Sequence, residues 1–247
     1  MSPDARQHRG PHPEDASLFD ADLIPALRQA TAELSWLLSR DYPLPSSLKL
    51  VGDRHRLAER QRAAVGRAAC SDRQLKRRSS TYKPIRDLKA EPLEIDGFNL
   101  LITVEAALSG AVLILCRDGC IRDLSSVHGS YRSVEETQKA IDLIGEMMEP
   151  IGPARVNWLL DQPVSNSGRL AQTIKDTAAE HGWPWSVELA FNPDSKMIES
   201  TSVAITSDSL VLDRAARWAN LARHLIGQSI PESWVIDLAA VAEGATR

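Results

Sequence analysis

Apolar residues in the first ninety positions recur at the spacing of α-helices. Six of them predict a helix within residues 18–38, namely Leu23, Ile24, Leu27, Leu34, Leu37 and Leu38. Ser46 or Ser47 can begin a second helix toward Val51, and residues 57–69 predict a third, followed by a basic tail over 73–89. We therefore predict a small all-helical module over residues 17–90, after a polar, proline-containing segment 1–16 that is expected to be disordered.

After residue 90 the pattern changes to short apolar runs that alternate with longer amphipathic ones. The short runs predict strands over residues 92–96, 111–116, 156–160, 187–190 and 203–206. The longer runs predict helices over residues 100–108, 134–148, 170–179 and 210–226. This alternation is typical of βαβ units. The predicted fold class is α/β, with a mostly parallel three-layer sheet domain over residues 91–247 behind the helical module.

The charges divide the chain at nearly the same place. Residues 1–90 carry 17 Lys and Arg against 11 Asp and Glu, whereas residues 91–247 carry 12 against 22. A basic module is suited to a polyanion such as RNA, and an acidic one to metal ions. Four arginines on the predicted third helix or in the segment just before it are the candidates for contacts with a nucleic-acid backbone: Arg54, Arg56, Arg60 and Arg62. Alternatively, the opposite charges dock the two modules on each other.

Composition excludes several classes of protein. With 43% hydrophobic residues the chain can bury a sizeable core. It has no run of about 18 uncharged apolar residues, so no membrane-spanning helix is expected, and residues 1–14 lack the apolar stretch of a secretory signal. Three cysteines are an odd number and too few for a disulfide scaffold, which favours a reducing, cytoplasmic location.

Three aspartates each follow a predicted strand, namely Asp96, Asp161 and Asp208. The carboxyl ends of parallel strands lie at one edge of a sheet, so these carboxylates can converge there. Converging carboxylates repel one another, and Mg²⁺ or Mn²⁺ relieves that repulsion. The three are therefore the candidate metal ligands and catalytic residues. The alternative is that each aspartate only caps a helix or starts a turn. Asp213 is a further carboxylate nearby, more simply explained as a solvated helical residue.

Polar residues beside these aspartates are candidate phosphate contacts. Hydroxyl, amide and guanidinium groups suit phosphate oxygens, and the candidates are Asn99, Ser165, Asn166, Ser167, Arg169 and Ser207. Ser165 or Asn166 can equally be a simple helix cap. Between two predicted elements, Asp118-Gly119 indicates a hairpin turn. Cys116 and Cys120 lack a second cysteine pair, so a zinc site is not expected.

Several of these motifs together resemble a known family. Residues 96–99, 165–169 and 206–209, with residues 48–54 and 60–62 before them, resemble an uncharacterised two-domain family that contains domain of unknown function 434. The resemblance covers roughly residues 18–228. Since the family has no established activity, the resemblance implies a domain arrangement and no reaction.

The stretch from Ile95 to Asn99 has a more distant resemblance, to the opening strand of PIN-like and NYN-type nucleases. Thr206-Ser207-Asp208 is similar to another strand end of that superfamily. The resemblance implies a PIN-like fold that cuts RNA with Mg²⁺ or Mn²⁺. Asp96 and Asp208 would be metal ligands and Asn99 an orienting group, while Asp161 is a looser match to a middle acid. Residues 165–169 have no counterpart there.

Three functions follow from the sequence. The first is a metal-dependent phosphodiesterase, an RNA endonuclease with a basic nucleic-acid-binding module. The second is a non-catalytic nucleic-acid-binding or regulatory protein with an inert PIN-like domain. The third is a small-molecule phosphohydrolase that uses residues 165–169. The sequence gives neither the substrate nor the oligomeric state.

Overall fold

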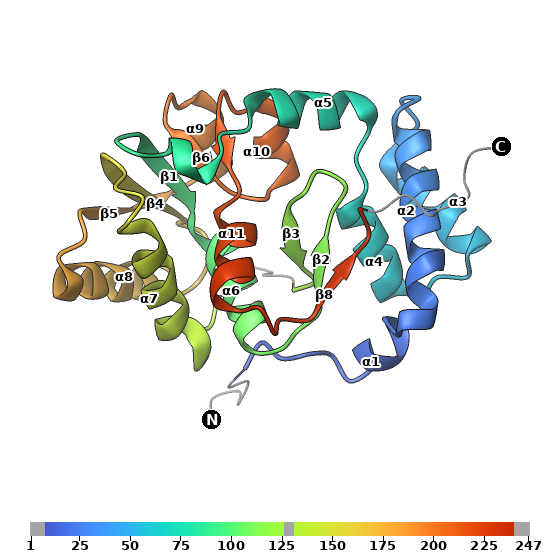
Figure 1. The fold of residues 1–247 in the computed structure, drawn as a ribbon, viewed down its shortest axis with the longest axis horizontal. Coiled ribbons are helices and arrows are strands. Elements are labelled where there is room, and N and C mark those ends of the chain that lie inside the picture. Colours follow the sequence, from blue (N-terminus) through green and yellow to red (C-terminus); the bar gives the residue numbers. More distant parts are fainter. Residues whose placement is uncertain (1–7, 126–130, 240–247) are drawn as a thin grey trace.

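The fold was obtained as a computed structural model, which describes residues 8–125 and 131–239 (Figure 1). The N-terminal part is helical, as predicted. Its elements are α1 (Asp15–Leu18), η1 (Ala21–Leu23), α2 (Ile24–Leu38), α3 (Leu44–Arg54), α4 (Glu59–Ala68), α5 (Asp72–Thr81) and η2 (Ile85–Asp87). Of the N-terminal segment predicted to be disordered, residues 1–7 lie outside the described residues.

A five-stranded parallel sheet forms the centre of the C-terminal part. Its strands are β1 (Pro92–Asp96), β4 (Arg155–Asp161), β5 (Trp185–Ala190), β6 (Val203–Ile205) and β7 (Trp218–Ala219), in the spatial order β5-β4-β1-β6-β7. Along the chain the strands are added first on one side of β1 and then, from β6, on the other. The order therefore reverses between β1 and β6, and ligands of open α/β sheets bind at such a point.

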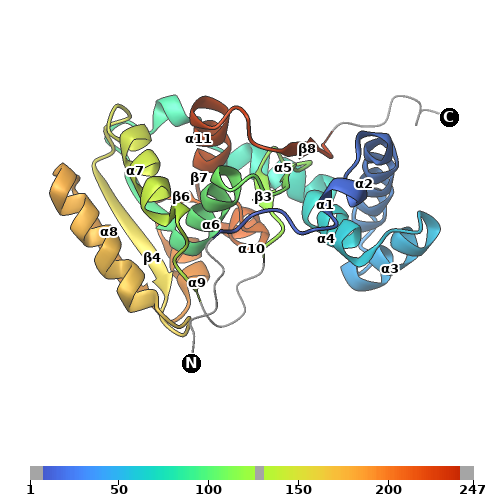
Figure 2. The same ribbon diagram turned by 90° about the horizontal axis from the view of Figure 1, so that it is seen from below.

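Helices cover both faces of this sheet. One face packs against α6 (Gly97–Leu108), α7 (Glu136–Met148), α8 (Ser167–His181) and α11 (Leu221–Ser229) in the largest core. The other face packs against α9 (Pro193–Glu199) and α10 (Ser209–Arg214) around Leu159, Met197 and Trp218. Figures 1 and 2 show these two helical layers on either side of the strands. The predicted fold class, α/β with a mostly parallel sheet behind a helical region, is confirmed.

A second, small sheet joins the two parts of the chain. It consists of β2 (Leu113–Leu115), β3 (Ile121–Asp123) and β8 (Val235–Asp237) in the order β3-β2-β8. Strands β2 and β3 form an antiparallel hairpin, and Gly119 in its turn has a φ of +81°. The hairpin predicted at Asp118-Gly119 is confirmed. Ile114 and Ile236 of this sheet share a core with the helices α2 and α4.

Two predicted segments were wrong. The helix predicted over residues 210–226 is split into α10, β7 and α11, because Trp218 and Ala219 are buried and pair with β6. The basic tail predicted over residues 73–89 contains helix α5, which begins with a capping box between Ser71 and Gln74. Across residues 8–125 and 131–239, the helices are all too short or too polar to span a membrane.

Candidate functional site

A pocket of about 530 Å³ opens at the carboxyl edge of the main sheet. It lies at the point where the strand order reverses, beside the ends of β1, β4 and β6. Charged residues dominate its lining: Arg67, Asp96, Arg122, Asp123, Asp161, Asp194 and Asp208. The three aspartates predicted from the strand ends therefore lie in one pocket.

Asp96 stands where β1 passes directly into α6. Its side chain accepts a hydrogen bond from the backbone N–H of Asn99 at 3.3 Å, which caps the helix, and another from the Thr206 hydroxyl at 2.8 Å. Gly97 makes this tight passage possible, because a Cβ there would lie 2.9 Å from the Leu159 carbonyl oxygen. The backbone of β1 and α6 can thus approach β4 closely, which buries the Asp96 carboxylate at the pocket.

Asn99 and Ser207 hold the end of β6 against α6. The Asn99 side-chain oxygen accepts hydrogen bonds from the backbone N–H and the hydroxyl of Ser207, both at 2.9 Å. Asp208 follows and caps α10 by accepting from the backbone N–H of Leu210 at 2.8 Å. Only one Asp208 oxygen takes part in the cap. Asn99 and Ser207 therefore use these polar groups to fix Asp208 at the pocket.

The carboxylates of the pocket influence one another electrostatically. The pKa of Asp96 is raised to about 7, mainly by burial and in addition by the nearby Asp194 and Asp208, against the lowering effect of the Thr206 hydroxyl. Burial, Asp208 and Asp161 raise the pKa of Asp194. The pKa of Asp161 is raised by burial. Asp194 thus interacts with all three predicted aspartates and is the common member of the cluster.

The turn from Ser165 to Arg169 lies beside the pocket and not in its described lining. Asn166 adopts a left-handed conformation with a φ of +71°, and its amide donates to the Tyr131 carbonyl at 2.9 Å. The buried Ser167 donates its hydroxyl to the Asp161 and Val164 carbonyls, so it stabilises the turn. Ser165 and Arg169 are exposed, with Arg169 in the first turn of α8.

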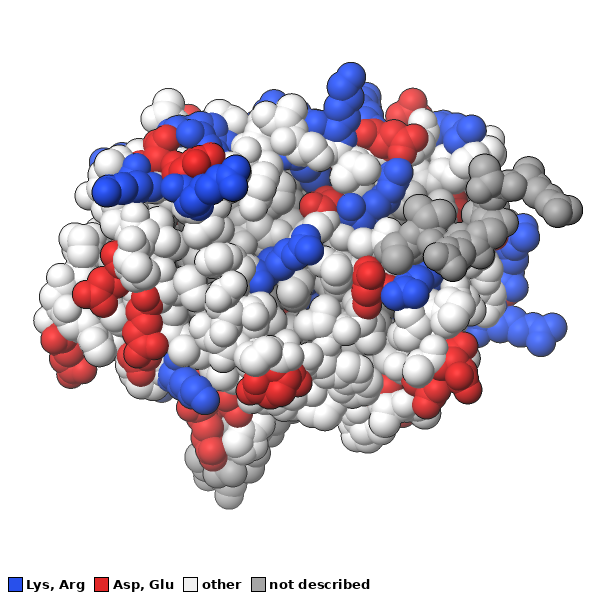
Figure 3. Space-filling model, viewed as in Figure 1, with Lys and Arg blue, Asp and Glu red and all other residues white. Residues whose placement is uncertain are grey.

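The four arginines predicted to hold nucleic acid have different surroundings. Arg60 makes an ion pair with the fully buried Asp15, and Arg62 donates to Asp53 at 2.9 Å and to the Leu57 carbonyl at 2.9 Å. Arg54 lies 3.5 Å from Glu33 with 71% of its side chain exposed, and Arg56 is exposed. On the face shown in Figure 3, basic and acidic side chains are interspersed.

Sequence reasoning missed four charged residues of the pocket. Asp194 lies in the first turn of α9, four residues after the end of β5, so the rule of an acid after a strand would have found it with a slightly wider spacing. Asp123 ends β3, a strand of the second sheet. Arg67 comes from α4 and donates to the Asp123 and Ser125 carbonyls. Arg122 comes from β3, and nothing in the sequence distinguishes it from a surface arginine.

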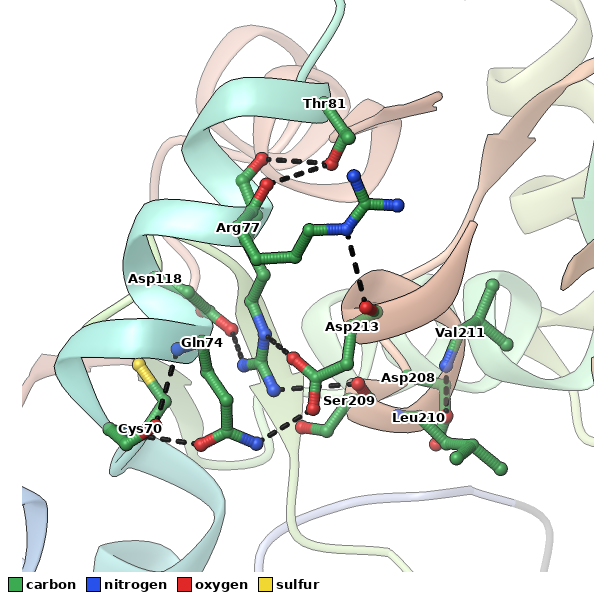
Figure 4. A network of polar contacts seen from close by, with 12 residues as sticks. Cys70, Gln74, Arg77, Thr81, Asp118, Asp208, Ser209, Leu210, Val211 and Asp213 are labelled. Atoms are coloured by element: carbon green, nitrogen blue, oxygen red, sulfur yellow. Dashed lines mark hydrogen bonds and ion pairs between the residues drawn. The ribbon is translucent and has the colours of Figure 1, made fainter. Parts of the chain in front are cut away.

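A buried polar network supports the pocket from behind (Figure 4). Asp118 accepts hydrogen bonds from Arg78 at 2.5 Å and from Arg122 at 2.7 Å, and Arg78 also donates to Asp213 at 2.7 Å. Arg122 in turn donates to the Ser207 carbonyl at 2.8 Å. The network therefore connects α5, the β2–β3 hairpin and α10 to the residue that precedes Asp208.

A metal ion in this pocket would need a bound phosphate to complete the coordination that the protein side chains provide. Within residues 8–125 and 131–239, no group of three or more His, Cys, Asp and Glu side chains is placed to hold a metal ion on its own. The three cysteines are buried and free, and burial raises the pKa of Cys70 and of Cys116 to about 11, so they are poor thiolate ligands. The oxygen donors of the pocket suit Mg²⁺ or Mn²⁺ completed by a phosphate.

Comparison with known proteins agrees with this division of the chain. Residues 85–224 match the family described as "Domain of unknown function (DUF5616)", and residues 26–80 match "Protein of unknown function (DUF434)". The chain is 30% identical over 187 residues to "Uncharacterized protein MJ0935" of Methanocaldococcus jannaschii, covering 76% of this chain and 89% of that protein. No solved structure matches.

The pocket combines residues from both matched regions. Gly66 and Arg67 lie in the first region, and Asp96 through Ser209 lie in the second. The resemblance to a two-domain family is confirmed: the chain belongs to the family of unknown function in which a DUF434 region precedes a DUF5616 domain.

Proposed function

We propose that the protein is a metal-dependent phosphodiesterase that acts on RNA. The observation that carries the proposal is the cluster of Asp96, Asp161, Asp194 and Asp208 in one pocket at the point where the strand order reverses. Carboxylates that repel one another in a partly buried site favour a divalent cation. Burial is the main cause of the raised pKa values of Asp96 and Asp194, and the neighbouring aspartates add to it.

The donor set fits Mg²⁺ or Mn²⁺ better than a softer metal. Mg²⁺ is commonly held by one or two carboxylates together with substrate phosphate and water, so a preformed cage of three protein ligands is not required. In this pocket one or two of Asp96, Asp194 and Asp208 would hold the cation, with water and the substrate phosphate as its other ligands. The cation would polarise the phosphodiester and lower the pKa of an attacking water.

Two arginines of the pocket supply positive charge and hold the carboxylate-bearing segment in place. Arg67 lines the pocket from the helical module, and its side chain is 35% exposed, so it can meet a phosphate oxygen. Arg122 holds the Ser207 carbonyl and so fixes the corner that carries Asp208. A bound cation would favour the ionised form of Asp96, whose pKa is raised to about 7 by burial and by the neighbouring carboxylates.

Two other functions predict different results. A non-catalytic nucleic-acid-binding protein is compatible with the exposed Arg54 and Arg56, and it would retain RNA without cutting it. A small-molecule phosphohydrolase that uses residues 165–169 has less support, because that turn is outside the described pocket lining.

The test is a cleavage assay with labelled single-stranded and hairpin RNA in Mn²⁺, in Mg²⁺ and in chelator. Asp208→Asn keeps the oxygen that caps α10, so the variant is expected to fold. It should lower the cleavage rate by about 10²- to 10⁴-fold, the range typical for a positioned proton-transfer or ligand group. Asp176→Asn is the matched control, because Asp176 is an exposed aspartate on α8 that hydrogen-bonds only to Gln172.

Metal-dependent fragments from the wild type and the Asp176 variant, with none from a folded Asp208 variant, would support the proposal. Unchanged cleavage by the Asp208 variant would contradict it. Intact RNA in every lane, with RNA still retained by the protein, would favour the non-catalytic function.

A further inference from the structure

Phe191 is the most exposed of the large hydrophobic side chains in the described part of the chain, with 81% of its surface accessible. Leu189, two residues earlier and inside β5, is 40% exposed. Solvation of a phenyl ring is unfavourable, and a ring this exposed adds nothing to the core. Its position is therefore better explained by a contact outside the chain.

Phe191 lies next to the acidic pocket. It follows the last residue of β5, and the backbone N–H of Gln162 donates to the Ala190 carbonyl at 2.8 Å, so the ends of β4 and β5 stay together. Asp161 ends β4 and Asp194 begins α9, and both line the pocket. Phe191 is thus at the carboxyl edge of the sheet, one residue after Ala190, which pairs with Asp161, and three residues before Asp194.

Arg169 provides a cation at the same edge. Helix α8 joins the end of β4 to the start of β5 and packs along both strands, so its first turn lies near their carboxyl ends (Figure 2). Arg169 is exposed in that turn, and its guanidinium has no hydrogen bond or ion pair within residues 8–125 and 131–239. An exposed aromatic residue and an exposed arginine thus lie outside the pocket lining, at the same edge of the sheet as the pocket.

We propose that Phe191 is a stacking platform for an unpaired base of a single-stranded nucleic acid whose phosphodiester occupies the acidic pocket, with Arg169 contacting the backbone next to that base. The inference rests on the proposed phosphodiesterase and names its substrate as single-stranded. Aromatic rings and cations along a groove are the usual means of holding single strands, because every base has a face that can stack. A paired base is already stacked within its duplex and offers no such face.

A protein partner is a poorer match for this surface. Stable protein interfaces bury about 800 Å² on each side and centre on several apolar side chains. Here only two exposed apolar residues, Leu189 and Phe191, lie at the end of β5, near the pocket residues Asp161 and Asp194 in the fold. A flexible strand that places one base on the ring and one phosphate in the pocket requires only this small area.

The experiment measures binding and hydrolysis separately. Binding of a 12-nucleotide single-stranded RNA carrying 2-aminopurine is measured by fluorescence in the full-length Asp208→Asn protein, with and without Phe191→Ala. Loss of one stacked base should weaken binding by roughly 5- to 150-fold. Phe191→Trp should restore binding. Tyr42→Ala, which removes an aromatic ring that is 56% exposed on the helical module, should leave it unchanged.

Hydrolysis of bis(4-nitrophenyl) phosphate with Mn²⁺ tests the pocket without the platform, since this diester is too small to span both. Phe191→Ala in the otherwise wild-type protein should hydrolyse it at the wild-type rate. If both proteins hydrolyse the diester and bind RNA equally well, the platform is overturned and the phosphodiesterase stands. If the wild type does not hydrolyse it but Phe191→Ala still weakens RNA binding, the phosphodiesterase fails and the platform stands.

Discussion

Asp96 and Asp118 are both buried aspartates, and their surroundings are opposite. Asp96 faces Asp194 and Asp208, and its pKa is raised to about 7 by burial and by these charges. Burial alone would raise the pKa of Asp118 too, but Arg122 and Arg78 lower it below its usual range. The same residue type is thus paired with cations in one region and crowded with carboxylates in the other.

This difference distinguishes the structural network around Asp118 from the candidate functional site around Asp96. In the network of Arg78, Asp118 and Arg122 each buried charge has an opposite charge within hydrogen-bond distance. The folded protein therefore gains nothing from an added ion there. In the pocket the carboxylates oppose one another, and a cation bound to the folded state would relieve that cost. Arg122 joins the two regions through the Ser207 carbonyl.

Removing the charge of Asp118 should have the largest effect on stability. Asp118→Asn leaves Arg78 and Arg122 buried without their shared carboxylate, and breaking a buried ion pair in this way costs about 3–5 kcal/mol. Urea unfolding, which does not screen charges, measures the free energy of unfolding. The control is Asp72→Asn, since Asp72 pairs with Arg117 but its side chain is 73% exposed, and a change within about 1 kcal/mol is expected. Equal effects of the two substitutions would mean that the buried network contributes no more to the free energy of unfolding than an exposed ion pair.

Removing the charge of Asp96 should instead stabilise the protein at alkaline pH. The folded pKa of about 7 lies above the unfolded value of 3.8, so the ionised form costs the folded state free energy that grows as pH rises from about 4 to 7. Asp96→Asn should therefore raise the free energy of unfolding by about 2–4 kcal/mol at pH 8 and by much less at pH 4. The two Asp96 oxygens have separate partners, so asparagine keeps the oxygen that caps α6, while its amide can donate to the Thr206 hydroxyl oxygen in place of the lost acceptor. A variant that is less stable than the wild type at both pH values would contradict this account.

The two regions also differ in how well the sequence predicts them. Asp96, Asp161 and Asp208 were predicted to share an edge because each follows a buried apolar strand, and parallel strands bring such ends together. Asp194 was missed because it stands on a seven-residue helix, too short for periodicity to indicate. The local pattern thus predicts which residues lie at an edge, and the tertiary structure decides which of them meet.

The structural network around Asp118 was not predicted from the sequence, for a different reason. Arg78 lies in a basic stretch that is typical of an exposed tail, yet its side chain is 2% exposed. Asp118 was predicted correctly as part of a hairpin turn, but no local rule pairs it with an arginine 40 positions earlier. Likewise, the two-residue strand β7 is recognisable only from its pairing with β6. Contacts between distant segments determine these features, and a single sequence does not display them.

The smallest effect is expected at the exposed arginines of the helical module, and it sharpens the contrast between buried and exposed charge. Arg60 is a poor probe, because its removal would leave Asp15 buried without a partner. Arg54 and Arg56 are exposed, so replacing both with Gln should change the free energy of unfolding by no more than about 0.5 kcal/mol.

The binding constant for a single strand falls as salt rises, and each phosphate contact contributes about 0.7 to the magnitude of the slope of log binding constant against log salt concentration. If these two arginines contact the backbone, the double substitution should reduce that magnitude by about 1.4. The measurement is RNA binding to the Asp208→Asn protein between 50 and 200 mM salt, a range over which phosphate contacts dominate the change. Arg86→Gln is the matched control, since Arg86 is 85% exposed on η2 and should leave the slope unchanged. An unaltered slope in the double variant would mean that Arg54 and Arg56 do not contact RNA, and that Arg67 in the pocket is the main charged contribution of the helical module to the site.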